Sequence, residues 1–130
     1  MKYVLGFVFN ESLDKIALIR KNRPAWQKGL LNGIGGKIEA DELTLDAMTR
    51  EFEEETSCSI DNYKWFESSH IEFDGGLVYC YATTFHNLDL LHCDESEEIE
   101  IHFLDRLQDE KLAPNLLDHL NIALSKLKSN

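Results

Sequence analysis

The chain has 130 residues, with 13 Lys and Arg against 24 Asp and Glu and a formal net charge of −11. This length fits a single domain spanning residues 1–130, long enough to bury a core without disulfide or metal staples. So negative a surface disfavours binding to the backbone of duplex nucleic acid, although bound divalent cations still let an acidic protein hold a polyphosphate.

Neither a membrane span nor a secretion signal is expected. The sequence has no run of 18 or more apolar residues, and residues 1–10 lack a charged leader and a small-residue cleavage site. Three cysteines, Cys58, Cys80 and Cys93, are an odd number at irregular spacing, which favours buried thiols in a reducing compartment. We therefore expect a cytoplasmic protein without a membrane partner, either a monomer or a homodimer.

The first third of the chain reads as strands around a glycine-rich turn. Tyr3–Phe9 and Lys15–Lys21 have strand-like apolar patterns, and the polar residues Asn10–Asp14 between them predict a hairpin. Asn22–Gly29 contains a proline and reads as a loop. Leu30–Ile38 contains three glycines, so its backbone is expected to bend tightly or to approach another group closely.

A helix is predicted from Thr44 to Thr56. Leu45, Met48 and Phe52 recur at helical spacing and would form its apolar stripe, with Thr44 as the N-cap.

The rest of the chain alternates between strand patterns and polar connections. A hairpin is predicted for Lys64–Phe73 and Leu77–Phe85 around Asp74, Gly75 and Gly76. The later segments are an acidic loop at His86–Glu97, a strand at Glu98–Phe103, a connector of low regular content at Asp105–Pro114 and an amphipathic helix at Leu116–Leu127. Hairpins combined with two helices predict a mixed sheet covered by helices, an α+β or α/β sandwich.

The predicted helix Thr44–Thr56 has a face of carboxylates. Glu51, Glu54 and Glu55 lie within about a third of its circumference, at roughly 100° per residue. Such like-charged neighbours destabilise a helix, and a divalent cation such as Mg²⁺ or Mn²⁺ would offset the repulsion. A solvated acidic face is the alternative. The glycine-rich segment directly upstream favours the metal, because the backbone of such a loop at a helix start can also hold phosphate.

These residues match a known pattern. Gly36 is followed after five residues by Glu42, and after seven more by the run Arg50-Glu51-Phe52-Glu53-Glu54-Glu55-Thr56-Ser57-Cys58. This arrangement resembles the Nudix box and keeps every charged position of it. The one departure is Ser57, where the family has a glycine that caps the helix in a left-handed conformation, so we expect a local loss of stability there.

The resemblance implies an α/β fold, the Nudix-type α/β/α sandwich with a mixed β-sheet, and a metal-dependent hydrolase that cuts a pyrophosphate linkage. It implies that Glu51 and Glu54 are catalytic, that Arg50 orients a glutamate, and that Glu42 supports the site. The implied ligands of Mg²⁺ (or Mn²⁺) are Glu51, Glu54, Glu55, the backbone carbonyl of Gly35, and Glu98 from the later loop, with Glu97 as the alternative to Glu98. The metal would lower the pKa of a water, and a glutamate would remove its proton.

The segment from Leu31 to Lys37 is similar to the branch of the family that cleanses oxidised purine nucleoside triphosphates, in which an Asn at the Asn32 position helps to read the base. Aromatic residues for a stacking pocket are Trp26, Phe7 and Phe9, although Trp26 could instead cap the core. The remaining candidates for substrate binding are Gly36, Lys37, Arg23 and Asn115, and Arg20 and Lys21 are further candidate cations for the leaving phosphate.

The substrate itself stays open. The segment around Asn115 lacks the acidic pair with which some enzymes of this branch read oxidised guanine. The small-molecule nucleotide partner is therefore a nucleoside triphosphate, oxidised or not, or alternatively ADP-ribose, another sugar nucleotide or a dinucleoside polyphosphate. A module that senses a nucleotide without cutting it is the alternative of another class.

Overall fold

The structure is a computed structural model that describes residues 1–93 and 97–129, and in these residues seven strands form one sheet. The strands are β1 (Lys2–Asn10), β2 (Lys15–Arg20), β3 (Leu31–Asn32), β4 (Ile34–Lys37), β5 (Phe66–Phe73), β6 (Gly76–Phe85) and β7 (Glu98–Phe103). The helices are α1 (Thr44–Thr56) and α2 (Leu116–Ser129), with short 3-10 helices η1 (Ala25–Gln27), η2 (Asn62–Lys64), η3 (Leu88–Leu90) and η4 (Leu104–Asp109).

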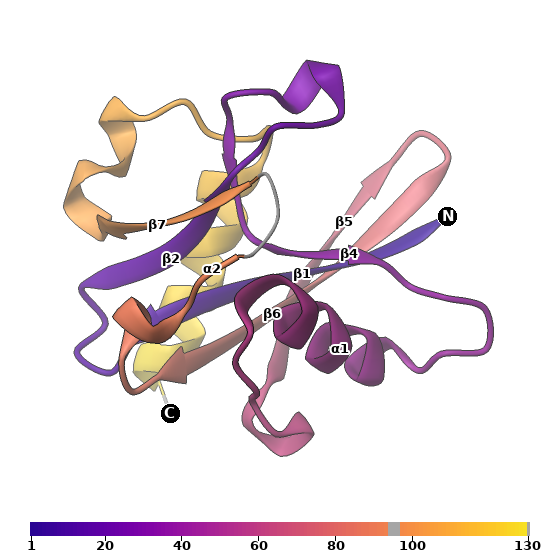
Figure 1. Cartoon of the computed structure of the whole chain (residues 1–130), viewed down its shortest axis with the longest axis horizontal. Helices are drawn as coiled ribbons and strands as arrows, with labels where there is room; N and C mark the ends of the chain where they lie inside the picture. Colours follow the sequence, from indigo (N-terminus) through magenta and orange to yellow (C-terminus); the bar gives the residue numbers. More distant parts are fainter. Residues whose placement is uncertain (94–96, 130) are drawn as a thin grey trace.

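The sheet is mixed, as predicted, and β1 runs through its middle (Figure 1). The strand order is β3-β2-β1-β6-β5, while β4 also pairs with β1 and β7 also pairs with β2. Strands β1 and β6 are parallel, and the other described pairs are antiparallel. Two predicted hairpins, β1–β2 and β5–β6, are both present.

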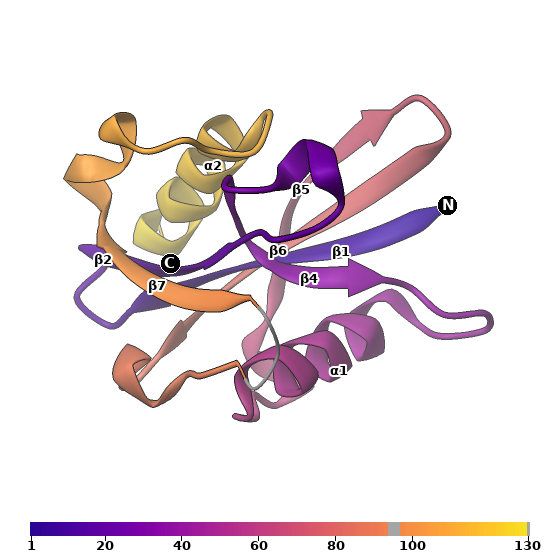
Figure 2. The same cartoon turned by 45° about the horizontal axis from the view of Figure 1, so that its top comes forward.

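A helix covers each face of the sheet, which confirms the α/β/α sandwich (Figure 2). Alternation along β1 sends Val4 and Val8 into the core that contains the α1 residues Met48 and Phe52. The same alternation sends Phe7 and Phe9 into a second core with the α2 residues Leu116 and Leu120. At about 25 cal/mol per Å² of apolar surface removed from water, these two layers provide the main stabilisation of the fold.

Two local predictions need correction. Leu43, in extended conformation, precedes the first turn of α1 and makes no side-chain cap, so Thr44 is the first helical residue and not the N-cap. The connector Asp105–Pro114 is more regular than expected, because η4 covers its first half and Leu112 pairs with Leu31 of β3 in an isolated parallel bridge.

The end of α1 matches its prediction: Ser57 has a φ of 63°, the left-handed conformation expected of the family's glycine. None of the helices in the described residues is long and apolar enough to cross a membrane.

Candidate active site

Arg50 organises the acidic face of α1. Its Nε and Nη2 donate to the two oxygens of Glu42 at 2.8 and 3.0 Å, and its Nη1 donates to Glu51 at 2.8 Å and Glu54 at 3.0 Å. Nη2 also donates to the backbone carbonyl of Lys37 at 3.0 Å. The hydrogen bonds from Arg50 lower the pKa of Glu42. One guanidinium therefore ties the end of β4, the loop before α1 and two box glutamates together.

Gly35 and Gly36 let the strand β4 approach its neighbours closely. A Cβ on Gly35 would collide with the carbonyl oxygen of Val4 on β1, and a Cβ on Gly36 would collide with the carboxylate of Glu51. The predicted close approach at the glycine-rich segment is therefore confirmed, and the Gly36 backbone forms one wall of the Glu51 position.

Glu51 and Glu55 are carboxylates withdrawn from water. The side chain of Glu51 is 13% exposed, and burial raises its pKa despite the adjacent Arg50. Burial also raises the pKa of Glu55 to about 8, and the charge of Glu51 adds to the effect. Lys21 and a hydrogen bond from the Gly35 backbone partly oppose this rise. Glu54 is different, since 57% of its side chain is exposed.

Glu97, the residue directly before β7, joins this cluster. Ile99 and Ile101 pack against the α1 core, and the negative charge of Glu97 helps to raise the pKa of Glu55. Glu98 is exposed, and it follows the alternation that places Glu100 beside Arg20 on the other face of the sheet. The structure therefore brings Glu97, not Glu98, towards the box glutamates.

Asn32 of β3 is hydrogen-bonded to the loop between β2 and β3, which contains Trp26. The amide of Asn32 donates to Oε1 of Gln27 at 3.2 Å, and its oxygen accepts from the backbone N–H of Gly33 at 2.8 Å. Trp26 lies in η1 with 66% of its surface exposed, so it does not cap the core. Its indole face remains open to an aromatic ligand.

Two aromatic candidates are excluded by burial. Phe7 and Phe9 are fully buried in the α2 core, so the prediction that they line a base-stacking pocket is wrong. The apolar pattern of β1 in the sequence does not distinguish an aromatic residue in the core from one that faces a ligand.

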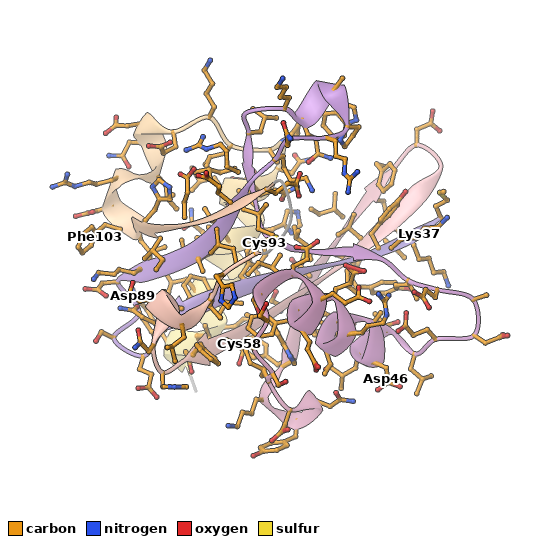
Figure 3. All side chains as sticks on the ribbon, in the orientation of Figure 1. Lys37, Asp46, Cys58, Asp89, Cys93 and Phe103 are labelled. Atoms are coloured by element: carbon orange, nitrogen blue, oxygen red, sulfur yellow. The ribbon has the colours of Figure 1, made fainter. Side chains whose placement is uncertain are left out.

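The predicted cations have different surroundings. Lys37 is exposed at the end of β4, as Figure 3 shows. Arg23 is exposed, and its backbone N–H lies 3.4 Å from Glu97. Arg20 is held by Glu100 at 2.7 Å and Glu110 at 3.0 Å, so it is a structural cation.

Asn115 stands directly before α2, exposed and with a φ of 67°. Its segment lies beside β3, because the N–H of Ala113 donates to the carbonyl of Leu31 at 2.9 Å. The residues before α2 are thus brought next to the strand that carries Asn32.

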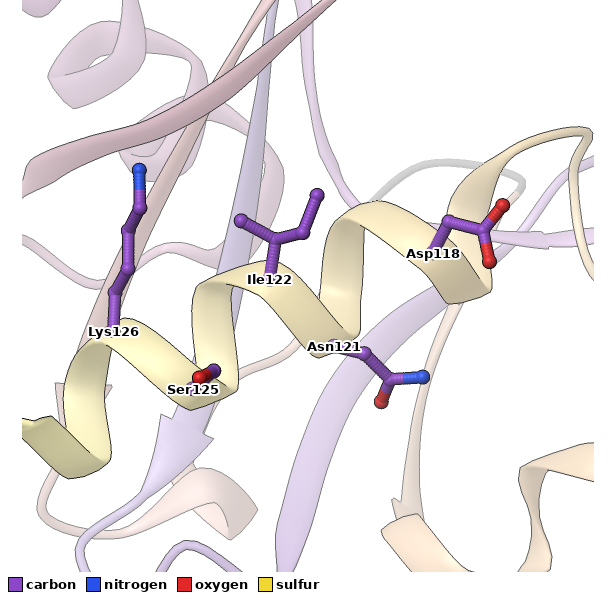
Figure 4. A pocket seen from close by; sticks show the side chains of 5 residues that line it. All are labelled: Asp118, Asn121, Ile122, Ser125 and Lys126. Atoms are coloured by element: carbon purple, nitrogen blue, oxygen red, sulfur yellow. The ribbon is translucent and has the colours of Figure 1, made fainter.

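Two shallow hollows in the described residues are lined by helical residues and not by the glycines of β4. One, of about 470 Å³, lies along the exposed side of α1 and includes Arg50, Glu54 and Asn62. The other, of about 490 Å³, lies on α2, where Figure 4 shows Asp118 and Lys126 at its two ends. The α2 hollow contains none of the predicted site residues.

The donor chemistry around Gly35 and Gly36 fits a divalent cation. Within residues 1–93 and 97–129, no three His, Cys, Asp or Glu side chains already converge as a metal-binding group. The hydrogen bonds to Arg50, however, use one oxygen of Glu51 and one of Glu54 and leave the other for a cation. Burial first, and then the charges of neighbouring glutamates, raise the pKa values of Glu51 and Glu55, and a hard cation stabilises the charged form of such carboxylates.

The family model described as the NUDIX domain matches residues 1–120. No curated protein matches the chain. Among solved structures, the chain is similar to a MutT from a study of Aliivibrio salmonicida and Vibrio cholerae, with 22% identity, a TM-score of 0.80, and coverage of 97% of this chain and 99% of that one.

Shewanella oneidensis NrtR provides two further similar structures. Its NUDIX domain complexed with ADP ribose has 17% identity and a TM-score of 0.80, covering 98% of this chain and 88% of that one. NrtR complexed with a 27mer DNA has 16% identity and a TM-score of 0.77, covering 98% of this chain and 62% of that one. At these identities the likeness establishes the fold.

Proposed function

Because this chain belongs to the NUDIX family, we propose that it hydrolyses a nucleoside triphosphate to the monophosphate and pyrophosphate with the help of Mg²⁺ or Mn²⁺. The observation that carries this proposal is the pair of partly buried carboxylates, Glu51 and Glu55, set against the glycine backbone of β4, with Glu51 also hydrogen-bonded to Arg50. A polyphosphate brings negative charge to an already acidic site, so cations must accompany it.

The residues that would hold the metal are Glu51, Glu54, Glu55 and the carbonyl of Gly35. When bound, the cation would neutralise the diphosphate and lower the pKa of a water molecule. Glu98 is left out of this set, because it stands on the face of β7 that carries Glu100.

The protein's own part in the reaction is proton transfer and positioning. Glu51 or Glu54 accepts the proton of the attacking water, and both are oriented by Nη1 of Arg50. Glu42 fixes the guanidinium by its two hydrogen bonds and so keeps that orientation. Water attacks one phosphorus of the α–β anhydride and the bond from that phosphorus to the bridging oxygen breaks, so that the monophosphate and pyrophosphate separate. Lys37 and Arg23 supply positive charge near the leaving group.

The nucleotide is held by the loop between β2 and β3 and by the residues around it. Trp26 stacks on the base, Asn32 reads its edge, and the Gly36 backbone lets the phosphates come close. Asn115, whose segment is hydrogen-bonded to β3, offers a second amide to the base. The exposure of Trp26 and the bond between Asn32 and Gln27 support this arrangement.

The net charge of the chain favours a small molecule over duplex nucleic acid as the partner. The net charge of −11 opposes association with duplex nucleic acid. The NrtR complexed with DNA is a longer chain, of which this chain spans 62%. Residues 1–130 act in this proposal as one domain, and the three free cysteines favour a reducing compartment such as the cytoplasm.

The test is a substrate panel with Mg²⁺ or Mn²⁺: canonical and oxidised nucleoside triphosphates, ADP-ribose, other sugar nucleotides and dinucleoside polyphosphates, with released phosphate products measured. We expect a nucleoside triphosphate to give the highest kcat/KM, with pyrophosphate as product. Turnover of ADP-ribose alone would overturn the choice of substrate, and no turnover of any compound by a folded sample would overturn the activity.

A module that binds nucleotide without cutting it is the second candidate, because a similar NUDIX domain was solved in complex with ADP ribose. The variants Glu54→Gln and Glu55→Gln separate the two. Catalysis predicts that turnover falls by orders of magnitude while circular dichroism still reports a folded protein. Nucleotide binding by the unmodified chain without any turnover would favour the sensing module.

A further inference from the structure

Glu97 has a different set of partners from the box glutamates. Its Oε2 accepts from the backbone N–H of Asn22 at 2.8 Å and lies 3.4 Å from the N–H of Arg23. Its Oε1 accepts from Nζ of Lys21 at 3.2 Å. The carboxylate is therefore already surrounded by donors, all from the segment where β2 ends and the following loop begins.

This contact is sheltered. The side chain of Glu97 is 13% exposed and that of Lys21 is 20% exposed. Burial by itself would raise the pKa of Glu97, but the hydrogen bonds from Asn22 and Lys21 outweigh it and lower that pKa. The charged carboxylate is thus the form that this environment stabilises.

The loop that Glu97 holds is residues 22–29. The loop is closed at its base by two backbone bonds, from Lys21 N–H to the Leu30 carbonyl and from Gly29 N–H to the Lys21 carbonyl, both 2.8 Å. Within it, Gln27 accepts from Asn32 at 3.2 Å. An anchor at Asn22 therefore acts on the position of Trp26 and Gln27 through the loop backbone.

Strand β7 and the residue directly before it hold this loop from both faces of the sheet. On the face of α1, Glu97 contacts Lys21 and Asn22. On the face of α2, Glu100 binds Arg20 at 2.7 Å, and Nη1 of Arg20 donates to the carbonyl of Gly29 at 3.1 Å. Both ends of the loop are thus fixed by ion pairs. Lys21 pairs with Glu97, directly before β7, and Arg20 pairs with Glu100, within β7.

We propose that Glu97 is a positioning residue for the nucleotide: its carboxylate anchors loop 22–29, which sets where Trp26 and Gln27 meet the base. This inference rests on the proposed function for its substrate. It makes Glu97 a link between the glutamate cluster and the base-binding loop, since Lys21 contacts Glu97 and its charge also acts on Glu55.

The first test needs no activity. Amide hydrogen exchange by NMR compares Glu97→Ala with the unmodified chain and with Glu72→Ala, a control that removes an 81% exposed glutamate from β5. We expect the amide of Asn22 to exchange at least ~10-fold faster in Glu97→Ala only, because a hydrogen bond to a charged group is lost. The amide of Lys21, bonded to Leu30, is the internal reference. Unchanged protection of Asn22 would overturn the anchor.

The second test uses steady-state kinetics with the nucleotide found by the panel. Glu97→Ala should raise KM at least ~10-fold with kcat within about 3-fold, while Glu97→Gln, which keeps an acceptor oxygen, recovers part of the loss. The Mn²⁺ concentration for half-maximal activity should stay unchanged. A fall in kcat together with a higher Mn²⁺ requirement and an unchanged KM would overturn the proposal and make Glu97 a metal ligand. Absence of all turnover would instead reject the proposed function and leave the exchange result standing.

Discussion

The carboxylate of Glu51 fills the space beside Gly36 that a Cβ atom would need, with its Cδ 2.5 Å from that position. The side chain of Glu51 is largely shielded from water, and Nη1 of Arg50 donates to its carboxylate at 2.8 Å. The carboxylate of Glu51 thus lies between the backbone of Gly36 and the guanidinium of Arg50, so its position depends on both of these residues.

The substitution Gly36→Ala should therefore displace Glu51 and lower kcat by roughly 100-fold, as expected when a reacting group is misplaced by about 1 Å. The control is Gly75→Ala, in the β5–β6 turn at a φ of +86°. That change strains the backbone and costs about 1–2 kcal/mol of stability, yet it should leave kcat unchanged. Equal kinetic losses in the two variants would show that Gly36 acts through stability alone. Urea unfolding and initial rates measure both quantities.

Arg50→Lys removes the planar donor fork that reaches Glu42, Glu51 and Glu54 together. A lysine ammonium is a point charge and cannot hold three carboxylates and the Lys37 carbonyl in that geometry. We expect kcat/KM to fall roughly 10–100-fold, the usual effect of losing a residue that orients metal ligands. Arg106→Lys, at an exposed position of η4, is the matched control and should behave as the unmodified chain. Full activity in Arg50→Lys would mean that charge alone is needed there.

The helix of the box was the most predictable part of the chain. Its bounds, Thr44–Thr56, and its buried residues Met48 and Phe52 follow from the 3.6-residue period of the sequence. Glu51 and Glu55 lie side by side for the same reason. The helical period determines which residues share one face of a helix, so the glutamate cluster can be predicted from the sequence before the fold is known.

Long-range relationships were less predictable. Phe7 and Phe9 read as candidate ligands in the sequence, because a strand pattern does not say which face meets a second helix. Likewise, Glu97 and Glu98 are adjacent acids. The pairing of β7 with β2 assigns the face of Glu98, and hydrogen bonds to Lys21 and Asn22 place Glu97. The sequence did contain a signal for the face of Glu97. Ile99 and Ile101 are apolar and alternate along the strand, so residues 97, 99 and 101 are expected on the same, core-facing side.

Cys80 should resist alkylation in the folded protein. Burial raises the pKa of its thiol to about 11, so at pH 8 only about one molecule in a thousand carries the reactive thiolate. Cys58 and Cys93 are half-buried. Iodoacetamide at pH 8 should therefore modify at most these two cysteines, as read by mass spectrometry of the peptides, and all three after unfolding in guanidinium. Rapid native modification of Cys80 would contradict the burial of β6 in the α2 core.

Ser57→Gly should stabilise the protein. Ser57 ends α1 with a φ of 63°, and its N–H donates to the carbonyl of Glu53 at 3.0 Å. A left-handed conformation destabilises the folded state by about 1–2 kcal/mol when the residue has a Cβ, and glycine avoids this strain. Glycine also gives the unfolded chain more conformational freedom, which offsets part of the gain. The net gain of about 0.5–1 kcal/mol corresponds to a Tm increase of about 2–4 °C. Differential scanning calorimetry measures it, with Ser57→Ala as the control that keeps the Cβ and should show no gain. Because the side chain of Ser57 lies outside the proposed metal set, kcat should stay the same. A lower Tm in Ser57→Gly would mean that the serine hydroxyl contributes more to the helix end than the strained backbone costs.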